Sequence, residues 1–424
     1  AALDARPRVT LMSGSHRRVF DAVARHLPAG GRGAYLVRAL AGSMGLRLCG
    51  MALGFLVGVQ LARGLGPSGY GVYGIAMSIV SLLLIPLEFG VPQLVTREVA
   101  ATHRDGVASS AILAWSTRLV LANSLVLAAI SLPVVLWSGA VEDRSLKSAL
   151  LLGLLMLPTI AASNILSAAL RGMQRVIEGQ IAELVIRPTL ISALLLFLSV
   201  WRGGAYLSAS MAMVLNALAA FVGSAYAYFR LAPTLATMVR TSPSPELRSA
   251  WLRSALPLAM GDGMRIVSGQ LGILVLGAFA AIDEVGIYRV AFGIYVVATL
   301  PSALLNATCS PMLARLYAEG RMDAIQRLNG WMTLFLILSA AVCILPFALG
   351  GEAIVSLVFG AEFEPAVPIL MTLLLGELAA GLLGHPTIVL NMLRHERAVT
   401  WYSFLTMMLN LALCWALTPS LGGM

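Results

Sequence analysis

Charged residues are scarce in this sequence. Asp, Glu, Lys and Arg make up 12% of its 424 residues, whereas a soluble domain carries about 25%. Lys147 is the single lysine. Hydrophobic residues reach 59%, and the mean hydropathy is +0.87. Such a chain has too few polar groups to cover its apolar surface in water, which excludes a soluble globular protein and predicts lipid as its solvent.

Catalytic and metal-binding patterns are also missing. The four cysteines lie in apolar runs without the spacing of a metal site or a disulfide framework, and the histidines form no pair at helical spacing. No Gly-x-x-x-x-Gly-Lys phosphate loop is present. The sequence therefore predicts a protein that is not an enzyme and holds no metal or cofactor. Its net charge of +9 does not indicate nucleic acid, because basic residues of membrane proteins gather in cytoplasmic loops and anion sites.

Long apolar runs predict an all-α membrane protein with about eleven crossings, since one crossing takes about 20 apolar residues. The expected spans cover residues 44–62, 72–96, 109–137, 148–170, 181–200, 205–229, 252–280, 286–308, 329–350, 365–390 and 398–418. A polar stretch at 230–251 divides them. We therefore expect a basic N-terminal segment (1–43), a six-helix bundle (44–229), this linker and a second bundle (252–424).

The basic residues alternate with these spans. With the N-terminus in the cytoplasm, 21 of the 29 Lys and Arg residues fall in inner segments and four in outer loops. An excess on the cytoplasmic side is the rule for membrane proteins. The sequence thus predicts a multi-pass protein of a bacterial cytoplasmic membrane with its N-terminus inside.

The N-terminal segment has an amphipathic pattern. Val19, Phe20, Val23 and Leu27 share one face of a helix if residues 17–27 are helical. Such a helix fits an interfacial position on anionic membrane lipids, and a solvated basic tail fits the pattern equally well.

The two halves contain an internal repeat at an offset of 215 residues. The matching positions are 71–76 (GVYGIA) with 286–291 (GIYRVA), Ile79 with Ile294, and Pro86 with Pro301. Both copies start a span from the same outer side, so we expect parallel rather than inverted repeats. Two such bundles suit rocking about a central cavity. The prolines are expected to kink their helices and free backbone groups inside the bundle.

Ionisable residues inside spans are functional candidates, because a charge at the bilayer centre costs about 2.5–3.5 kcal/mol on insertion scales. Four arginines qualify: Arg47, Arg118, Arg265 and Arg289. Arginine stays charged and presents a planar fork of donors that matches phosphate oxygens, so we expect a cationic cavity for an anionic substrate. The alternative is that these side chains reach the interfaces or form structural ion pairs, and for Arg118 and Arg289 both interpretations stay open.

The acidic candidates are Glu88, Glu183, Asp262 and Glu377. Asp262 and Arg265 stand three residues apart on one helix face and can pair locally. Glu88 is the better candidate for coupling to protons or sodium, with Asp262 as a further cavity acid. Glu377 fits a hydrogen-bonding role between helices equally well.

Several motifs resemble one transporter family. The run 62–73 (ARGLGPSGYGVY) and the segment 88–91 (EFGV) are similar to the opening of the polysaccharide transporter family, the Wzx-type oligosaccharide flippases of the MOP superfamily. Segments 170–175 and 357–363 agree with it less specifically. The resemblance covers roughly residues 40–424 and implies two six-helix bundles in a MATE-like V shape. Because the sequence stops where that family starts its last span, we expect the twelfth helix to be missing.

The resemblance implies flipping of a polyprenyl-pyrophosphate-linked oligosaccharide from the inner to the outer leaflet by alternating access, for cell-surface polysaccharide assembly. Its partners would be this substrate, membrane lipids and, as options left open, a coupling H⁺ or Na⁺ and a polysaccharide polymerase. Arg47, Glu88, Asp262, Arg265 and Arg289 map onto the spans that line the family's cavity. The sequence departs from the family at Gly272 and Ile273, where an acidic–basic pair is common. Alternatives are a small-molecule or drug exporter of the same superfamily and, with less support, a membrane glycan polymerase or ligase.

Overall fold

The protein is helical wherever its structure is described. The computed structural model describes residues 32–102, 106–137, 143–201, 207–237, 243–383, 390 and 396–421, and no strand occurs within these ranges. An apolar chain in lipid satisfies its backbone hydrogen bonds within helices, so the predicted all-α class is confirmed. The predictions for residues 1–31 and for 238–242 of the linker lie outside the described residues.

The helices follow one another with short connections. They are α2 (Arg32–Glu88), α3 (Val91–Ala101), α4 (Gly106–Trp137), α5 (Arg144–Gly172), α6 (Val176–Ile181), the π-helix η1 (Ala182–Ile186), α7 (Arg187–Trp201), α8 (Ala209–Thr237), α9 (Pro245–Phe279), α10 (Ile282–Ala298), α11 (Leu300–Ala318), α12 (Met322–Phe359), the 3-10 helix η2 (Ala361–Phe363), α13 (Ala366–Leu382) and α15 (Glu396–Leu421). Asp143 caps α5 by accepting a hydrogen bond from Ser145 N, and Ser244 caps α9 in the same way.

Eight helices among the described residues are long and apolar enough to cross a membrane. One of them, Gly42–Glu88, has 47 residues, more than twice the length that one crossing requires. It bends at Gly66, which has a φ of 67° and a ψ of 177° inside α2. The predicted spans 44–62 and 72–96 are therefore largely joined in one bent helix. The protein is a multi-pass membrane protein.

The repeated prolines coincide with breaks in the helices. Pro86 lies two residues before the end of α2, where Phe89 and Gly90 have φ angles of 47° and 71°. Pro301 lies at the start of α11, just after α10 ends. Proline lacks the N–H that a helix interior needs, so Pro301 fits the first turn of α11, where no such bond is made. At the other break Gly90 is left-handed and Pro92 stands in the first turn of α3. A break between consecutive helices thus lies near each repeated proline, and within α2 the helix continues past Pro86 to Glu88.

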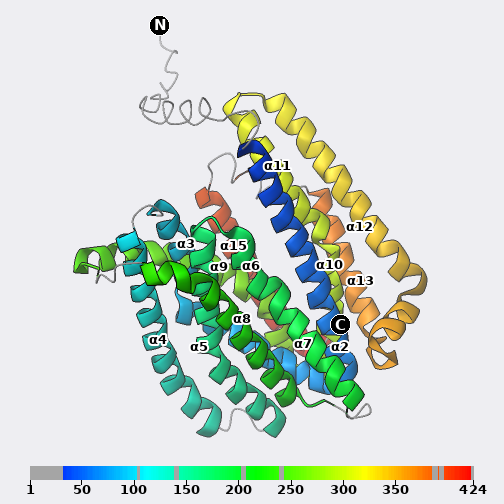
Figure 1. Ribbon diagram of the computed structural model, residues 1–424. Coiled ribbons are helices and arrows are strands. Elements are labelled where there is room, and N and C mark those ends of the chain that lie inside the picture. Colours follow the sequence, from blue (N-terminus) through cyan, green and yellow to red (C-terminus); the bar gives the residue numbers. More distant parts are fainter. Residues whose placement is uncertain are drawn as a thin grey trace.

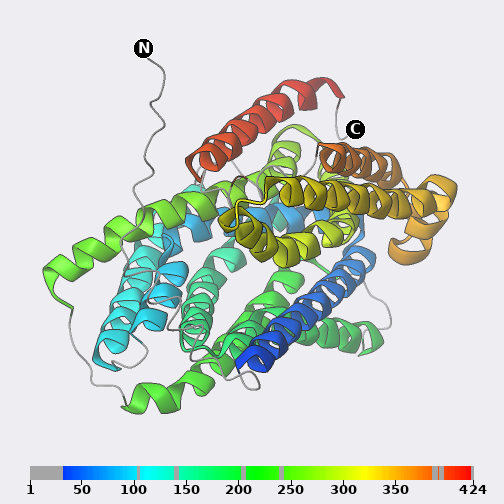
Figure 2. The same ribbon diagram turned by 90° about the horizontal axis from the view of Figure 1, so that it is seen from above.

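The bent helix α2 runs along the boundary between two groups of helices (Figure 1). Helices α3–α8 lie on one side of it and α10–α13 on the other, while α15 lies at one edge of the molecule in the view from above (Figure 2). Helix α9 packs along α2 and α3. Near its N-terminal end α9 also meets α4, where the Trp115 and Trp251 rings stand 5.3 Å apart. At the other end, a Cβ on Gly277 would lie 3.0 Å from Ile75.

The two copies of the repeat contact each other reciprocally at the bend. A Cβ built on Gly71 would lie 2.1 Å from the carbonyl oxygen of Ile282, and one on Gly286 would lie 2.0 Å from that of Pro67. The same offset of 215 residues relates Gly71 to Gly286 and Pro67 to Ile282. Only glycine permits this approach of backbone to backbone. We call this part of the molecule the Gly66 end and the opposite end of the first half of α2 the Arg47 end.

Arg63 adds a second connection at the Gly66 end. Its Nε donates to the carbonyl oxygen of Val358 at 2.8 Å, and its Nη2 donates to that of Leu357. Both carbonyls lie in the last turn of α12, where no intrahelical partner remains for them. We call helices α2–α8 the first half of the molecule and helices α9–α15 the second half. Arg63 on α2 thereby caps the C-terminus of a helix from the second half.

Removing this cap is expected to loosen the last turn of α12. A hydrogen bond to a charged group contributes about 1.5–3 kcal/mol, and we take the lower end or less because Arg63 is exposed. We expect Arg63→Ala to speed amide hydrogen exchange around Val358 roughly fivefold, measured by mass spectrometry. Arg144→Ala, which removes an equally exposed arginine from the start of α5, is the control. Equal exchange in both variants would contradict the capping role.

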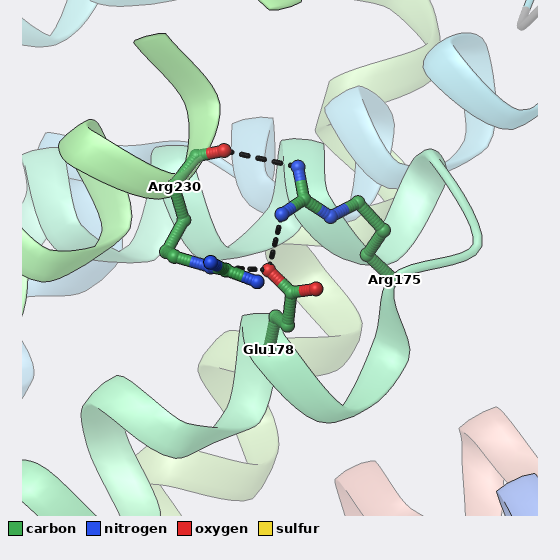
Figure 3. A network of polar contacts seen from close by, with 3 residues as sticks. All are labelled: Arg175, Glu178 and Arg230. Atoms are coloured by element: carbon green, nitrogen blue, oxygen red, sulfur yellow. Dashed lines mark hydrogen bonds and ion pairs between the residues drawn. The ribbon is translucent and has the colours of Figure 1, made fainter. Parts of the chain in front are cut away.

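An ion-pair cluster joins α6 to α8 (Figure 3). The Nε of Arg230 lies 2.6 Å from Oε2 of Glu178, and Nη2 of Arg175 contacts the same oxygen. Nη1 of Arg175 donates to the carbonyl oxygen of Arg230 at 2.9 Å. One carboxylate thus holds two arginines, which fixes the short helix α6 against α8 beside the π-helix.

A smaller cluster stands where α11 leads into α12, and its carboxylate, that of Glu319, lies just past the apolar helix Ile282–Ala318. The Nε of Arg315 lies 2.8 Å from Oε1 of Glu319, and Arg321 lies 3.6 Å from the other carboxylate oxygen. The hydrogen bond from Arg315 lowers the pKa of the Glu319 carboxyl below its ordinary value. The group is fully exposed to solvent, so its effect on stability is small.

Candidate functional site

Two adjoining cavities follow the first half of α2. The first, of about 400 Å³, lies between α2, α9, α10 and α12. The second, of about 330 Å³, lies between α2, α5, α6, η1 and α11. Met51 lines both. The two cavities therefore adjoin along α2, with the second nearer the Arg47 end. We call the two cavities together the path along α2.

The first cavity has mostly apolar walls. Its lining includes Met51, Phe55, Met77, Phe292, Val296 and Phe359. The polar lining comes from Ser78, Ser81 and Gln270, and the only charge is that of Arg289. The Oγ of Ser78 donates to Oε1 of Gln270 at 2.7 Å, which joins α2 to α9. A Cβ on Gly54 or Gly293 would meet no atom within 4 Å, so the cavity is open at these two glycines.

The second cavity is more polar. Arg47 and Arg171 line it together with Gln180 and Glu183, and Leu300, Ala303 and Leu304 close it from α11. The Oγ of Ser43 donates to Oε1 of Gln180 at 2.9 Å, which orients the amide. Two arginines and one carboxylate leave this end of the path positively charged.

The predicted arginines separate into two groups. Arg47 and Arg289 line the cavities, one at each end of the path. Arg118 is exposed on α4 and has no hydrogen bond or ion pair among the described residues. Its neighbours on that helix, Leu121 and Leu125, are also exposed, so Arg118 belongs to a surface that faces lipid or an interface.

Arg265 forms the predicted local pair with Asp262, with 3.7 Å between Nη2 and Oδ1. The Arg265 side chain is 76% exposed, and neither residue lines either cavity. Asp262 also accepts a hydrogen bond from Nε2 of Gln93 at 2.5 Å. This pair therefore connects α9 to α3 instead of facing the path along α2.

The remaining carboxylates have polar partners within the helix bundle. Glu88 is half-buried and accepts a hydrogen bond from Nδ2 of Asn164 at 2.6 Å. Glu377 accepts from the Tyr295 hydroxyl at 3.0 Å and from Ser302 at 2.8 Å. These two donors come from α10 and α11, so Glu377 joins both helices to α13 across the break near Pro301. This geometry favours the helix-to-helix role for Glu377.

Three further residues of the site were not predicted. The charge count groups Arg187 with the inner segment 171–187, but the structure places it at the start of α7, within the apolar helix Val176–Trp201. There its Nε and Nη2 donate to Oδ1 of Asn216 at 3.0 and 2.6 Å. The Nδ2 of Asn216 donates in turn to the Tyr73 hydroxyl at 2.6 Å. A polar asparagine inside a predicted span was the available signal, because such a group needs a partner in lipid.

No group of three or more metal-ligating side chains occurs among the described residues. The four cysteines lie at separate places and form no disulfide among the described residues. The polar chemistry of the cavities consists of guanidinium groups, hydroxyls, amides and the Glu183 carboxylate. The guanidinium groups, hydroxyls and amides bind anions and sugars by hydrogen bonds.

The fold matches solved membrane transporters. A MATE family multidrug resistance transporter of the MOP superfamily, in its inward-facing conformation, superposes with a TM-score of 0.62 at 15% identity, covering 89% of this chain and 87% of that one. The outward-facing conformation of such a transporter gives 0.58 at 15% identity, covering 86% and 84%. No curated protein matches the sequence. These likenesses show that the chain has a MATE-like fold of membrane-spanning helices.

The sequence assigns the chain to a narrower group of proteins than the fold does. The profile of the polysaccharide biosynthesis protein family matches residues 38–317, about two thirds of the chain. The protein belongs to this family, which includes the Wzx-type flippases. The resemblance found in residues 62–73 and 88–91 is thereby confirmed, as is the predicted MATE-like class of fold.

Proposed function

We propose that this transporter moves a polyprenyl-pyrophosphate-linked oligosaccharide from the inner to the outer leaflet of a bacterial cytoplasmic membrane by alternating access. The observation that carries this proposal is the path along α2, in which arginines stand at both ends of a mostly apolar wall. A lipid-linked glycan has an anionic diphosphate between an apolar tail and a polar sugar. Arginine is suited to the diphosphate, because its fork of donors matches phosphate oxygens.

The path gives the diphosphate two successive positions. Arg47 and Arg171 would receive it at the Arg47 end, and Arg289 would hold it in the first cavity. The open space at Gly54 and Gly293 would leave room for the substrate between the first half of α2 and α10. The polyprenyl tail would remain in lipid while the sugar occupies the cavity.

The orientation follows from the basic residues. An N-terminus in the cytoplasm places the Arg47 end inside and the Gly66 end outside, which agrees with the charge pattern of the sequence. The Gly66 end is closed by the glycine contacts and by Arg63. With an inside-negative membrane potential, each elementary charge on the substrate adds about 2.3 kcal/mol per 100 mV to outward movement.

Coupling to a proton or sodium ion would involve Glu88. Its carboxylate is held by Asn164 inside the first half and interacts electrostatically with Glu183, Asp262 and Arg171. Glu183 and Arg171 line the second cavity. A change in the charge of Glu88 would therefore change the electrostatic potential at the residues that would bind the substrate first.

The test is flipping of a fluorescent polyprenyl-diphosphate glycan in proteoliposomes that contain the full chain. We expect Arg47→Ala and Arg289→Ala to reduce the flipping rate at least about tenfold, since a lost charge-assisted hydrogen bond costs about 1.5–3 kcal/mol. Arg118→Ala, which removes an arginine outside both cavities, should stay within about twofold. Equal rates in all variants would refute the cavity assignment.

A small-molecule exporter is the second candidate, because the solved structures with this fold are multidrug resistance transporters. The same proteoliposomes distinguish the two. Uptake of a cationic dye together with an absence of glycan flipping would replace the first proposal with this one.

A further inference from the structure

Arg289 is oriented by residues of the opposite half. It belongs to α10, yet its guanidinium carbon lies 4.8 Å from the ring centroid of Tyr73 and 4.9 Å from that of Tyr70, both on α2. The planes of the two rings differ by 13°. A guanidinium that stacks on aromatic faces keeps its N–H groups available for a ligand. Within the described residues, Arg289 has no hydrogen bond or ion pair.

A buried chain of hydrogen bonds holds the Tyr73 ring in place through its hydroxyl group. Tyr73 and Asn216 are each 4% exposed. Asn216 donates to the Tyr73 hydroxyl and accepts from Arg187, so α2, α8 and α7 are linked in sequence. All three helices belong to the first half. The aromatic surface under Arg289 is thus part of a rigid network that does not include α10.

Gly74 provides the space that Arg289 occupies. A Cβ at this position would lie 2.8 Å from an Nη atom of Arg289 and 3.1 Å from its Cδ. The repeat offset of 215 aligns Gly74 with Arg289 itself. One half therefore supplies the cation, and the matching position of the other half leaves room for it.

We propose that Tyr70, Tyr73 and Asn216 are positioning residues that make Arg289 a strong diphosphate site only while the two halves touch at the Gly66 end. When the halves separate there, Arg289 moves away with α10 and loses both rings, and the diphosphate is released toward the side that has opened. The inference rests on the proposed function for the identity of the cargo. Its core, the dependence of anion binding on Tyr73 through Arg289, is independent of transport.

The test measures binding of a short-chain polyprenyl diphosphate, citronellyl diphosphate, to the purified full chain by calorimetry. We expect Tyr73→Leu to weaken binding about tenfold through loss of the cation–π contact, and Tyr73→Phe to weaken it only two- to threefold because the ring remains. Gly74→Ala, which displaces the guanidinium, should resemble Tyr73→Leu. The melting temperature of each variant reports its folding.

A double-mutant cycle separates positioning from a general structural effect. In the Arg289→Ala background, Tyr73→Leu should cause no further loss, because its effect passes through the guanidinium. An equal loss in both backgrounds, or none in the unmodified chain, would overturn the proposal. If the cycle behaves as expected and the glycan flipping assay fails, the positioning role stands and the identity of the cargo does not.

Discussion

Replacing Gly71 with alanine is expected to open the Gly66 end of the molecule. A Cβ at this position would stand 2.1 Å from the Ile282 carbonyl oxygen, far inside contact distance, so the two halves must move apart there. Overpacking of this kind costs about 1–3 kcal/mol. That cost falls only on the closed conformation, and it shifts the balance toward the open one by about 5- to 150-fold.

Cysteine accessibility measures this shift. A single cysteine at Gly54, which lines the first cavity, would be labelled in a cysteine-free background with a membrane-impermeant maleimide. Labelling from the side of the membrane that the Gly66 end faces should accelerate at least about fivefold in Gly71→Ala, and likewise in Gly286→Ala. Gly293→Ala is the matched control, because a Cβ there meets no atom within 4 Å. Equal labelling in Gly71→Ala and Gly293→Ala would show that the glycine contact does not govern closure.

Replacing Asn216 with leucine is expected to destabilise the first half. The substitution leaves the Arg187 guanidinium without its acceptor and the Tyr73 hydroxyl without its donor. A neutral hydrogen bond between membrane helices contributes only about 0.6 kcal/mol on average. Because the charged and half-buried Arg187 is involved here, we expect a loss of roughly 2–3 kcal/mol in the free energy of unfolding.

The comparison variant is Asn123→Leu, which removes a neutral interhelical hydrogen bond to the Leu87 carbonyl oxygen at 3.1 Å. Denaturant unfolding in detergent micelles should place Asn123→Leu within about 1 kcal/mol of the unmodified protein. Asn216→Asp, which keeps an acceptor for Arg187, should retain more stability than Asn216→Leu. A similar loss for Asn216→Leu and Asn123→Leu would mean that Arg187 finds another partner.

Sequence reasoning was strongest where a property depends on composition or on local order. The helical class follows from apolar length, the break before Pro301 from the chemistry of proline, and the Asp262–Arg265 pair from helical spacing. It also selected Arg47 and Arg289, which line the cavities, but could not separate them from Arg118 and Arg265. That separation depends on which face of each helix packs inward, and this is decided by neighbours distant in sequence.

The polar network of the first half was missed for a related reason. Tyr73 and Asn216 are neutral, so neither carries the desolvation cost that draws attention to a charge inside a span. Their importance comes from Arg187, 29 residues before Asn216. Arg187 lies where the predicted span 181–200 overlaps the inner segment 171–187, and it was counted with the segment. Only the packing of α7 on α8 and α2 brings the three residues together.

The contact between Gly74 and Arg289 has a consequence for the symmetry of the molecule. A parallel repeat of the kind that the sequence predicts relates two halves by an axis, and residues that match under such a repeat and also touch lie beside that axis. In a symmetric pair of identical subunits, an arginine at this position would face a second arginine, with like charges in one space, and a glycine would face a glycine across an empty gap. A single cation beside the axis requires two unequal halves, which one continuous chain provides and a homodimer cannot.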